Sequence, residues 1–83
     1  MSQIDNVIDI RRPVRFTIDG RGYQTRLRRQ RAADLLLLAG LDPVRYDLGE
    51  LAGTGLRARV YERGDVVAIR RGSAFVSRDR AGV

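Results

Sequence analysis

One segment of the chain is suited to a single helix, and segments with the alternation of β-strands flank it on both sides. Residues 30–39 are rich in Ala and Leu and contain no Gly, Pro or β-branched residue, a composition that favours a helix. Gly40 stands where a left-handed residue commonly ends a helix, and Pro43 prevents continuation. The buried face of this helix is predicted to comprise Ala33, Leu36 and Leu37, extended by Ala32 or Leu35.

The segment before the helix reads as a β-hairpin. Val14, Phe16 and Ile18 alternate with polar residues, as in a strand with one buried side. Residues 23–27 alternate in the same way, and the sequence Asp-Gly-Arg-Gly at 19–22 supplies a turn between the two strands.

The segment after the helix contains several short strands, predicted near residues 46–48, 56–61, 66–70 and 74–76. In the second of these, Leu56, Ala58 and Val60 are expected to point inward and Tyr61 outward. A hairpin, one helix and further strands allow the first and last long strands to pair in parallel. The sequence therefore predicts an α+β, ubiquitin-like β-grasp: a mixed sheet of four to five strands with one helix packed across it.

The expected organisation is an N-terminal arm at 1–12, a ubiquitin-like domain at 13–77 and a flexible C-terminal tail at 78–83. The arm carries four apolar residues, Ile4, Val7, Ile8 and Ile10. One reading is a frayed terminus, and the other is an arm that packs on the domain or joins it to a second copy as a homo-oligomer.

The residue types that are missing exclude much enzyme chemistry. The 83 residues include no Cys and no His, and all 16 basic residues are Arg. Cys and His nucleophiles, Ser-His-Asp triads, the usual zinc ligands and lysine Schiff bases are therefore excluded. The ten carboxylates form no evident acid–base pair. We expect no enzyme activity, no cofactor and no metal. The longest aliphatic run, Leu35–Leu38, is too short to cross a membrane, so a cytoplasmic protein is expected.

The net charge of +6 suits an acidic partner. An arginine-rich sheet face is predicted from Arg15, Arg26, Arg57, Arg59 and Arg70. It is either a solvated surface or a binding face for an acidic protein or nucleic acid. Nucleic acid is the less expected partner, because few aromatic rings are predicted to be exposed for base stacking.

Three stretches resemble a known family. FTIDGRGYQT, LLLLAGLDPVRYDL and VYERGDVVAIRRGSAFVS are similar to the bacterial multiubiquitin domain, over about residues 14 to 79. The most specific part is Leu38-Ala39-Gly40-Leu41-Asp42-Pro43 followed by Tyr46-Asp47-Leu48. Members often occur as tandem copies, whereas this chain holds one.

The resemblance implies a ubiquitin-like protein modifier. Its C-terminal carboxylate would be activated with ATP, passed to a thiol of a partner enzyme and transferred to a target protein. The implied partners are ubiquitin-type activating and conjugating enzymes, target proteins and a metalloprotease-type deconjugase. By the family pattern the conjugated residue is Gly82, with Arg78, Arg80 and Ala81 as tail contacts. Val83 departs from the glycine pair that usually ends such modifiers, so either it is trimmed, or the carboxylate of Val83 is used, or the chain is not conjugated.

Two alternatives to a modifier share the fold: a non-conjugated interaction module that uses the arginine face, and a sulfur carrier with a C-terminal thiocarboxylate. The absence of Lys has its own consequence, since a modifier without side-chain amines cannot form lysine-linked chains on itself. Its own acceptors would be the N-terminal amine and hydroxyls such as those of Thr54, Ser73 and Ser77.

Overall fold

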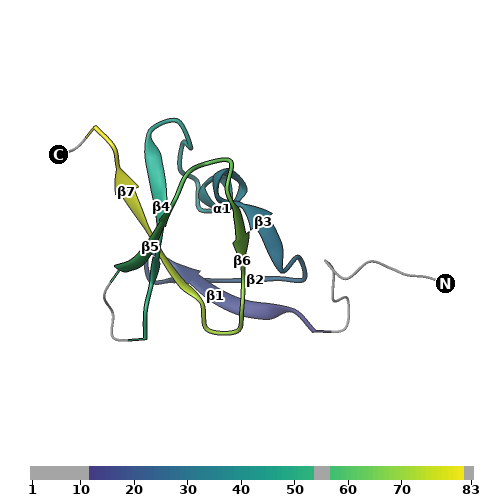
Figure 1. The fold of residues 1–83 in the computed structure, drawn as a ribbon. Coiled ribbons are helices and arrows are strands. Elements are labelled where there is room, and N and C mark those ends of the chain that lie inside the picture. Colours follow the sequence, from purple (N-terminus) through teal and green to yellow (C-terminus); the bar gives the residue numbers. More distant parts are fainter. Residues whose placement is uncertain (1–11, 54–56, 82–83) are drawn as a thin grey trace.

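The structure is a computed structural model that describes residues 12–53 and 57–81. Its elements appear in Figure 1. In chain order they are β1 (Val14–Ile18), β2 (Arg21–Thr25), β3 (Arg29–Arg31), α1 (Ala32–Leu38), β4 (Tyr46–Leu51), β5 (Arg57–Tyr61), β6 (Val66–Ala68) and β7 (Ala74–Asp79).

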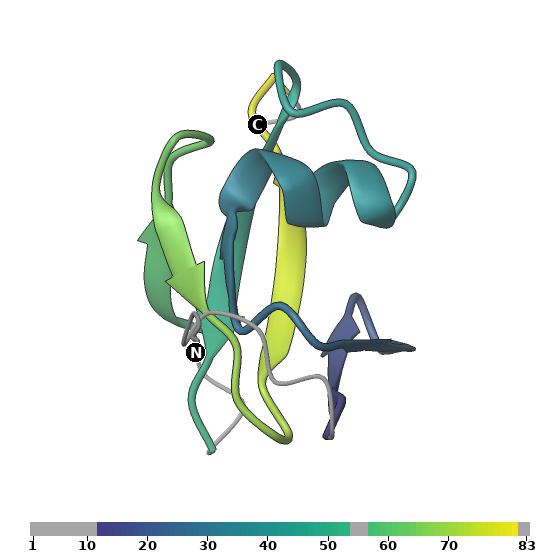
Figure 2. The same cartoon turned by 90° about the vertical axis from the view of Figure 1, so that its right-hand side faces the viewer.

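The main sheet has five strands in the order β2-β1-β7-β4-β5. β1 and β7 are parallel, whereas β1–β2, β7–β4 and β4–β5 are antiparallel. Figure 2 shows α1 lying across the sheet. These features confirm the predicted α+β β-grasp arrangement. The parallel partner of β1 is β7, which was predicted as a short strand and is six residues long. A second, two-stranded sheet of β3 and β6 was not predicted.

The β1–β2 turn has the geometry that its sequence favours. Ile18 pairs with Arg21 across a two-residue loop, and both loop residues have positive φ, 54° at Asp19 and 79° at Gly20. Positive φ at both positions defines a type I′ turn, which Asp-Gly adopts readily. The hairpin register therefore follows from local turn chemistry.

The helix is shorter than predicted and is rotated relative to the predicted face. Its buried residues are Ala32, Leu35 and Leu36, whereas Leu37 is 60% exposed. The reason is the path into the helix. Residues 29–31 form β3, and the Ala32 N–H donates to the carbonyl of Asp65, which turns Ala32 inward. A run of four Leu residues fits several rotations, so the strand before the helix decides the buried side.

The end of the helix is as predicted. Gly40 has a φ of 80° and its N–H donates to the Leu37 carbonyl, while the Leu41 N–H donates to the Leu36 carbonyl. This pair of bonds is the Schellman motif. Leu41 packs against the core.

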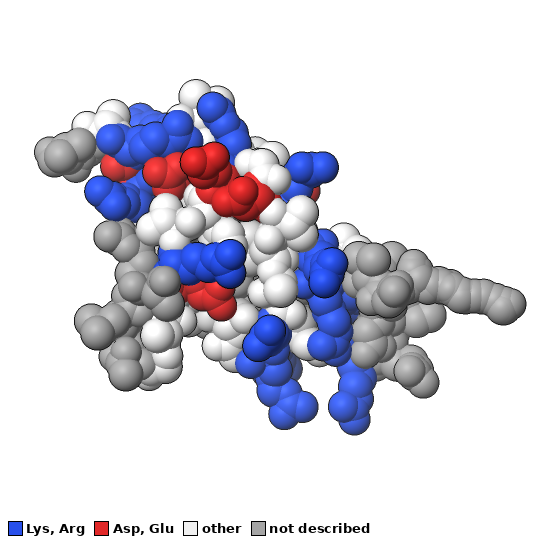
Figure 3. All heavy atoms as spheres, viewed as in Figure 1, with Lys and Arg blue, Asp and Glu red and all other residues white. Residues whose placement is uncertain are grey.

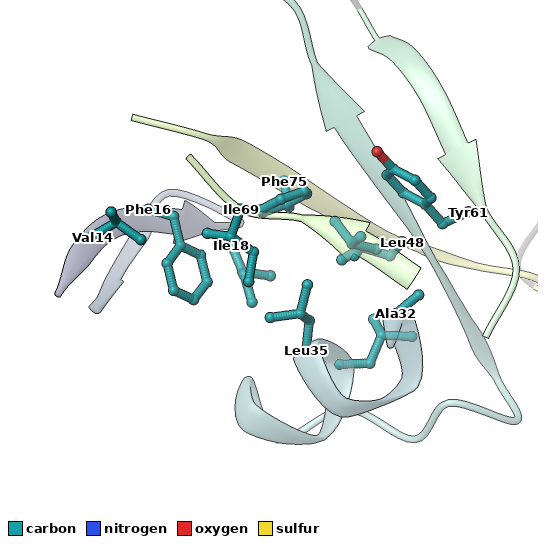
Figure 4. Packing of buried hydrophobic residues seen from close by; sticks show 11 residues of the cluster. Val14, Phe16, Ile18, Ala32, Leu35, Leu48, Tyr61, Ile69 and Phe75 are labelled. Carbon is teal, nitrogen blue, oxygen red and sulfur yellow. The ribbon is translucent and has the colours of Figure 1, made fainter. Parts of the chain in front are cut away.

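The core lies between α1 and the sheet (Figure 4). Phe75 on β7 is fully buried and meets the Phe16 ring edge-on, with 6.0 Å between ring centroids. Val14, Phe16 and Ile18 are buried as predicted. The other buried residues are Ala32, Leu35, Leu36, Leu48, Tyr61, Val67 and Ile69.

The prediction of which side chains of β5 point into the core was wrong. Tyr61 is 6% exposed and Val60 is 49% exposed, the reverse of the expectation. Tyr61 pairs with the buried Leu48, and a register shift between Glu50 and Leu51 accommodates the rest of β5. The sequence Arg-Ala-Arg-Val at 57–60 could place either set of alternate residues toward the core, so the pairing of β5 with β4 decides which set is buried. Leu56 lies outside the described residues, and so does the side chain of Ala58.

Within residues 12–53 and 57–81, no helix has the length and apolar character needed to cross a membrane. The predicted arm residues Ile4, Val7, Ile8 and Ile10 lie outside the described residues.

Candidate functional site

The carboxyl end of β7 is held to the sheet further along than predicted. β7 continues to Asp79, where the sequence predicted an end at residue 76 and a flexible tail from residue 78. Asp79 pairs with Tyr46 of β4, and the Arg80 N–H donates to the Arg45 carbonyl over 2.9 Å. The backbone at 78–80 is therefore paired with the β4 side of the sheet.

Side chains strengthen this attachment. Arg80 Nε lies 3.0 Å from Asp47 Oδ1, and Arg80 Nη2 donates to the Pro43 carbonyl over 3.0 Å. Arg45 Nε lies 3.2 Å from Asp79 Oδ2. Both ion pairs are partly exposed, so each is worth about 0–1 kcal/mol. We call this group the carboxyl end: Arg45, Asp47, Asp79 and Arg80.

The loop before β4 is shaped to receive the end of β7. The Asp42 carboxylate accepts from the Val44 N–H, and the Asp42 carbonyl accepts from the Arg45 and Tyr46 N–H groups. These bonds close the turn after the helix and leave the Pro43 carbonyl open to Arg80. The Asp-Pro pair thus has a second role beyond stopping the helix.

The last described residues are exposed to solvent at the point where the chain leaves the sheet. The Ala81 N–H donates to the Asp79 carboxylate over 2.9 Å, which turns the chain at this point. Arg78, Arg80 and Ala81 are all exposed, and Figure 1 shows this end of β7 projecting past the body of the sheet. Gly82 and Val83, the predicted conjugation residues, lie outside the described residues.

A contact that sequence reasoning missed links the first turn to the last strand. The Asp19 carboxylate accepts from the Ser77 N–H over 2.8 Å and from the Ser77 hydroxyl over 2.6 Å. The Asp19 N–H in turn donates to the Phe75 carbonyl. The Asp-Gly pair identifies the turn, but no sequence signal indicates that its carboxylate reaches a strand 58 residues away.

The predicted arginine face is not one surface. Arg15 extends from the side of β1 that faces away from the helix, because its neighbours Val14 and Phe16 are buried on the other side. Arg59 lies opposite Glu50 in the β4–β5 register. Its guanidinium lies over the Tyr61 ring, 5.2 Å from the ring centroid, on the side of the buried residues. Arg26 is exposed between β2 and β3, and Arg70 is exposed after β6. The side chain of Arg57 lies outside the described residues.

Tyr61, whose ring belongs to the core, makes a partly buried polar contact at the edge of the core. Its hydroxyl donates to Glu50 Oε1 over 2.6 Å. Burial raises the pKa of Tyr61 above its ordinary value, and the hydrogen bond to Glu50 raises this pKa further, because both favour the neutral phenol. Nearby Arg59 acts in the opposite direction.

No group of three or more His, Cys, Asp or Glu side chains suited to a metal ion occurs in the part of the chain that the structure describes. Comparisons with protein-family models, curated proteins and solved structures found no match for this chain. Its class, a β-grasp domain, therefore rests on strand order and the crossing helix.

Proposed function

We propose that the chain is a bacterial ubiquitin-like protein modifier of the kind that its resemblance to the multiubiquitin domain implies, acting in the cytoplasm. The observation that carries the proposal is the placement of exposed residues 80–81 at the end of the central strand β7. A modifier needs a folded domain that partner enzymes can bind while they reach its C-terminal carboxylate. The β-grasp sheet supplies such a domain.

In the proposed reaction, an activating enzyme joins the C-terminal carboxylate to the AMP portion of ATP, and pyrophosphate leaves. A thiol of the enzyme displaces AMP, and a nucleophile on the target then displaces the thiol. The carboxylate is that of Gly82 after removal of Val83, or that of Val83 itself. The domain contributes no reacting side chain. Arg78, Arg80 and Ala81 serve as contacts for the partner enzymes.

The contacts of Arg80 at the carboxyl end indicate what a partner enzyme would bind. Arg80 is held by Asp47 and Pro43, so an enzyme would meet a fixed Arg80 and Ala81 directly before the reacting end. Preorganised contacts cost less conformational entropy on binding than a loose tail does. Such contacts favour recognition of the folded domain together with its end.

A conjugation assay tests the proposal. The full chain is incubated with ATP, candidate activating and conjugating enzymes encoded nearby, and a cell extract, and adducts are detected by intact mass. We expect adducts from the full chain and none from a variant that lacks both Gly82 and Val83. A variant that lacks Val83 alone should remain active if trimming precedes conjugation. Adducts from the doubly truncated variant would refute the proposal.

The tail contacts have a matched control. Arg78→Ala should slow thioester formation with the activating enzyme, because Arg78 is exposed next to the reacting end. Arg63→Ala removes an equally charged, exposed residue from the β5–β6 turn and should leave the rate unchanged. Equal rates for the two variants would argue against the assigned contacts.

Chains of modifiers linked through their own side chains are not expected. The chain has no Lys. The Ser77 hydroxyl is bonded to Asp19, and the Ser73 hydroxyl accepts from the Arg70 N–H. Digested adducts should therefore carry remnants of the modifier on target residues and none on the modifier's own Ser73 or Ser77.

A second candidate function, a non-conjugated interaction module, has support in the arginines at the other end of the sheet. It predicts binding that weakens with salt and is unchanged by removal of Gly82 and Val83. The truncated variant in the conjugation assay separates the two functions.

A further inference from the structure

Two surface hollows meet at the turn between β6 and β7, at the opposite end of β7 from its carboxyl end. The larger, about 640 Å³, is lined in part by Arg15, Tyr23 and Arg71. The other, about 520 Å³, is lined in part by Arg12 and again by Arg71. Arg71 therefore stands between the two hollows. We call Arg12, Arg15 and Arg71, with the turn at 70–73, the turn end.

Hydrogen bonds hold the backbone of the turn at 70–73. The Ser73 N–H donates to the Arg70 carbonyl, and Gly72 has a φ of 82°, which is the pattern of a type II turn. The Ser73 hydroxyl accepts from the Arg70 N–H over 2.9 Å. The Gly72 N–H donates to the Arg15 carbonyl over 2.9 Å, so the turn is fastened to β1 beside Arg15. The positions from which Arg15 and Arg71 project are thus fixed before any ligand arrives.

The charge in these two hollows has one sign, whereas a third hollow, on the β4 side of the same turn, includes Glu50. None of the described residues that line these two hollows is Asp or Glu. Figure 3 shows blue side chains without red ones along the lower edge, where Figure 1 places this turn and the start of β1. The acidic side chains in this view lie higher, mainly near the carboxyl end. The turn end is therefore a cationic surface of guanidinium groups, which bind carboxylates in a bidentate manner.

The larger hollow also has features suited to a peptide. A Cβ added at Gly22 or Gly72 would meet nothing within 4 Å, so a chain can approach the backbone closely at both glycines. Thr17 and the half-buried Tyr23 also line this hollow, whereas the Phe16 side chain beneath them is 1% exposed and belongs to the core. The Tyr23 ring is half-buried and stacks on Phe16 with 5.8 Å between centroids, which leaves little ring surface for nucleic-acid bases to stack on.

We propose that the turn end binds an acidic peptide segment of a partner protein, whose carboxylates meet Arg15 and Arg71 in the larger hollow and Arg12 at the adjoining one. This surface is distinct from the carboxyl end and does not depend on conjugation. Because it lies at the far end of β7, a copy joined to a target through its C-terminus would still present it. The inference thus adds a recognition surface to the proposed modifier.

Binding of a fluorescent peptide of alternating Glu and Ser tests the proposal, with a Gln-and-Ser peptide and an oligothymidine of equal length as comparison probes. The variant is Arg15→Gln with Arg71→Gln. The control is Arg63→Gln with Arg78→Gln, which removes the same charge from exposed positions elsewhere. We expect the first variant to weaken binding of the Glu peptide about tenfold and the control about twofold or less, since charge-assisted hydrogen bonds exceed general attraction. Amide NMR shifts should concentrate at residues 15, 22–24 and 71–73.

Arg71→Lys supplies a second, milder variant. It keeps the charge and removes the planar fork, so it should weaken binding by an amount between wild type and the double variant. Equal losses in the double variant and its control would show attraction by net charge and overturn the proposal. No binding of the Glu peptide, or tighter binding of oligothymidine than of the peptide, would overturn it as well.

Discussion

The two ends of β7 use the same residue type in opposite ways. At the carboxyl end, Arg45 and Arg80 lie against the carboxylates of Asp79 and Asp47. At the turn end, Arg15 and Arg71 line a hollow to which the described residues contribute no carboxylate. The net charge of +6 is therefore not spread evenly over the described surface. At the carboxyl end the arginines hold the chain to the sheet, whereas at the turn end they line an open hollow.

The largest effect is expected from the strand that joins the two ends. Phe75→Ala removes a fully buried ring from the centre of the sheet and should lower the free energy of unfolding by about 3–5 kcal/mol. Urea unfolding followed by circular dichroism measures this loss. The adjacent Val76 is half-buried, and Val76→Ala should cost clearly less. Equal costs would contradict the assignment of Phe75 to the core.

The next effect concerns the two hydrogen bonds between Asp19 in the first turn and Ser77 in β7, which we call the clamp. Asp19→Ala removes both bonds to Ser77 and places a residue without a polar side chain at a φ of 54°. We expect a loss of about 1–3 kcal/mol. Asp19→Asn tolerates the backbone and keeps one acceptor, and Ser77→Ala loses one bond, so both should cost less than Asp19→Ala. Hydrogen exchange at the Ser77 amide should quicken most in the alanine variant at position 19; unchanged exchange there would refute the clamp.

The buried phenol gives a pH dependence. Because the pKa of Tyr61 is raised in the folded state above its ordinary value of 10.0, its stabilising contribution is complete below that value and declines as the pH rises through the folded-state pKa. Tyr61→Phe should cost about 1 kcal/mol near neutral pH and less at strongly alkaline pH. Phenolate absorbance should show a titration step above pH 10.0, and that step should vanish in the variant. A titration curve unaltered by the substitution would contradict the burial of Tyr61.

The smallest effect compares the two ends directly. Arg80→Gln breaks an ion pair with Asp47 and should lower stability by about 0.2–1 kcal/mol. Arg71→Gln removes a charge from among other arginines and should leave stability equal or slightly higher, within about 0.5 kcal/mol. Both changes should shrink at about 1 M salt, where the Debye length is near 3 Å. The same sign for both variants at low salt would break the contrast between the ends.

Local chemistry made much of the fold predictable. The alternation of Val14, Phe16 and Ile18 and the Gly40 helix end are set by neighbouring residues and are as predicted. The Asp-Gly turn was also foreseen, but it is shorter than the predicted 19–22, because Arg21 and Gly22 belong to β2. A parallel partner for β1 followed from the order of elements, although β7 was predicted as a short strand. These features depend on short-range preferences and on few topological alternatives.

The errors arose where several arrangements fit the same residues. The four-Leu run allowed more than one helix rotation, and Arg-Ala-Arg-Val-Tyr allowed either orientation of β5. Pairing of β3 with β6 and of β4 with β5 chose between them. At the candidate site, exposure of Arg78, Arg80 and Ala81 was foreseeable, but the bonds of Arg80 to Asp47 and Pro43 were not, because they join residues that only the folded sheet brings together.

The parallel contact between β1 and β7 also bears on how the molecule is made. The central strand β7 is the last strand of the described domain in chain order, and β1 has no neighbour on that side until β7 is present. The hairpin and helix can form early from nearby residues, whereas the sheet must wait for a distant partner. Completion of the sheet thus depends on its last strand, so a fragment that ends before β7 should remain sensitive to proteases.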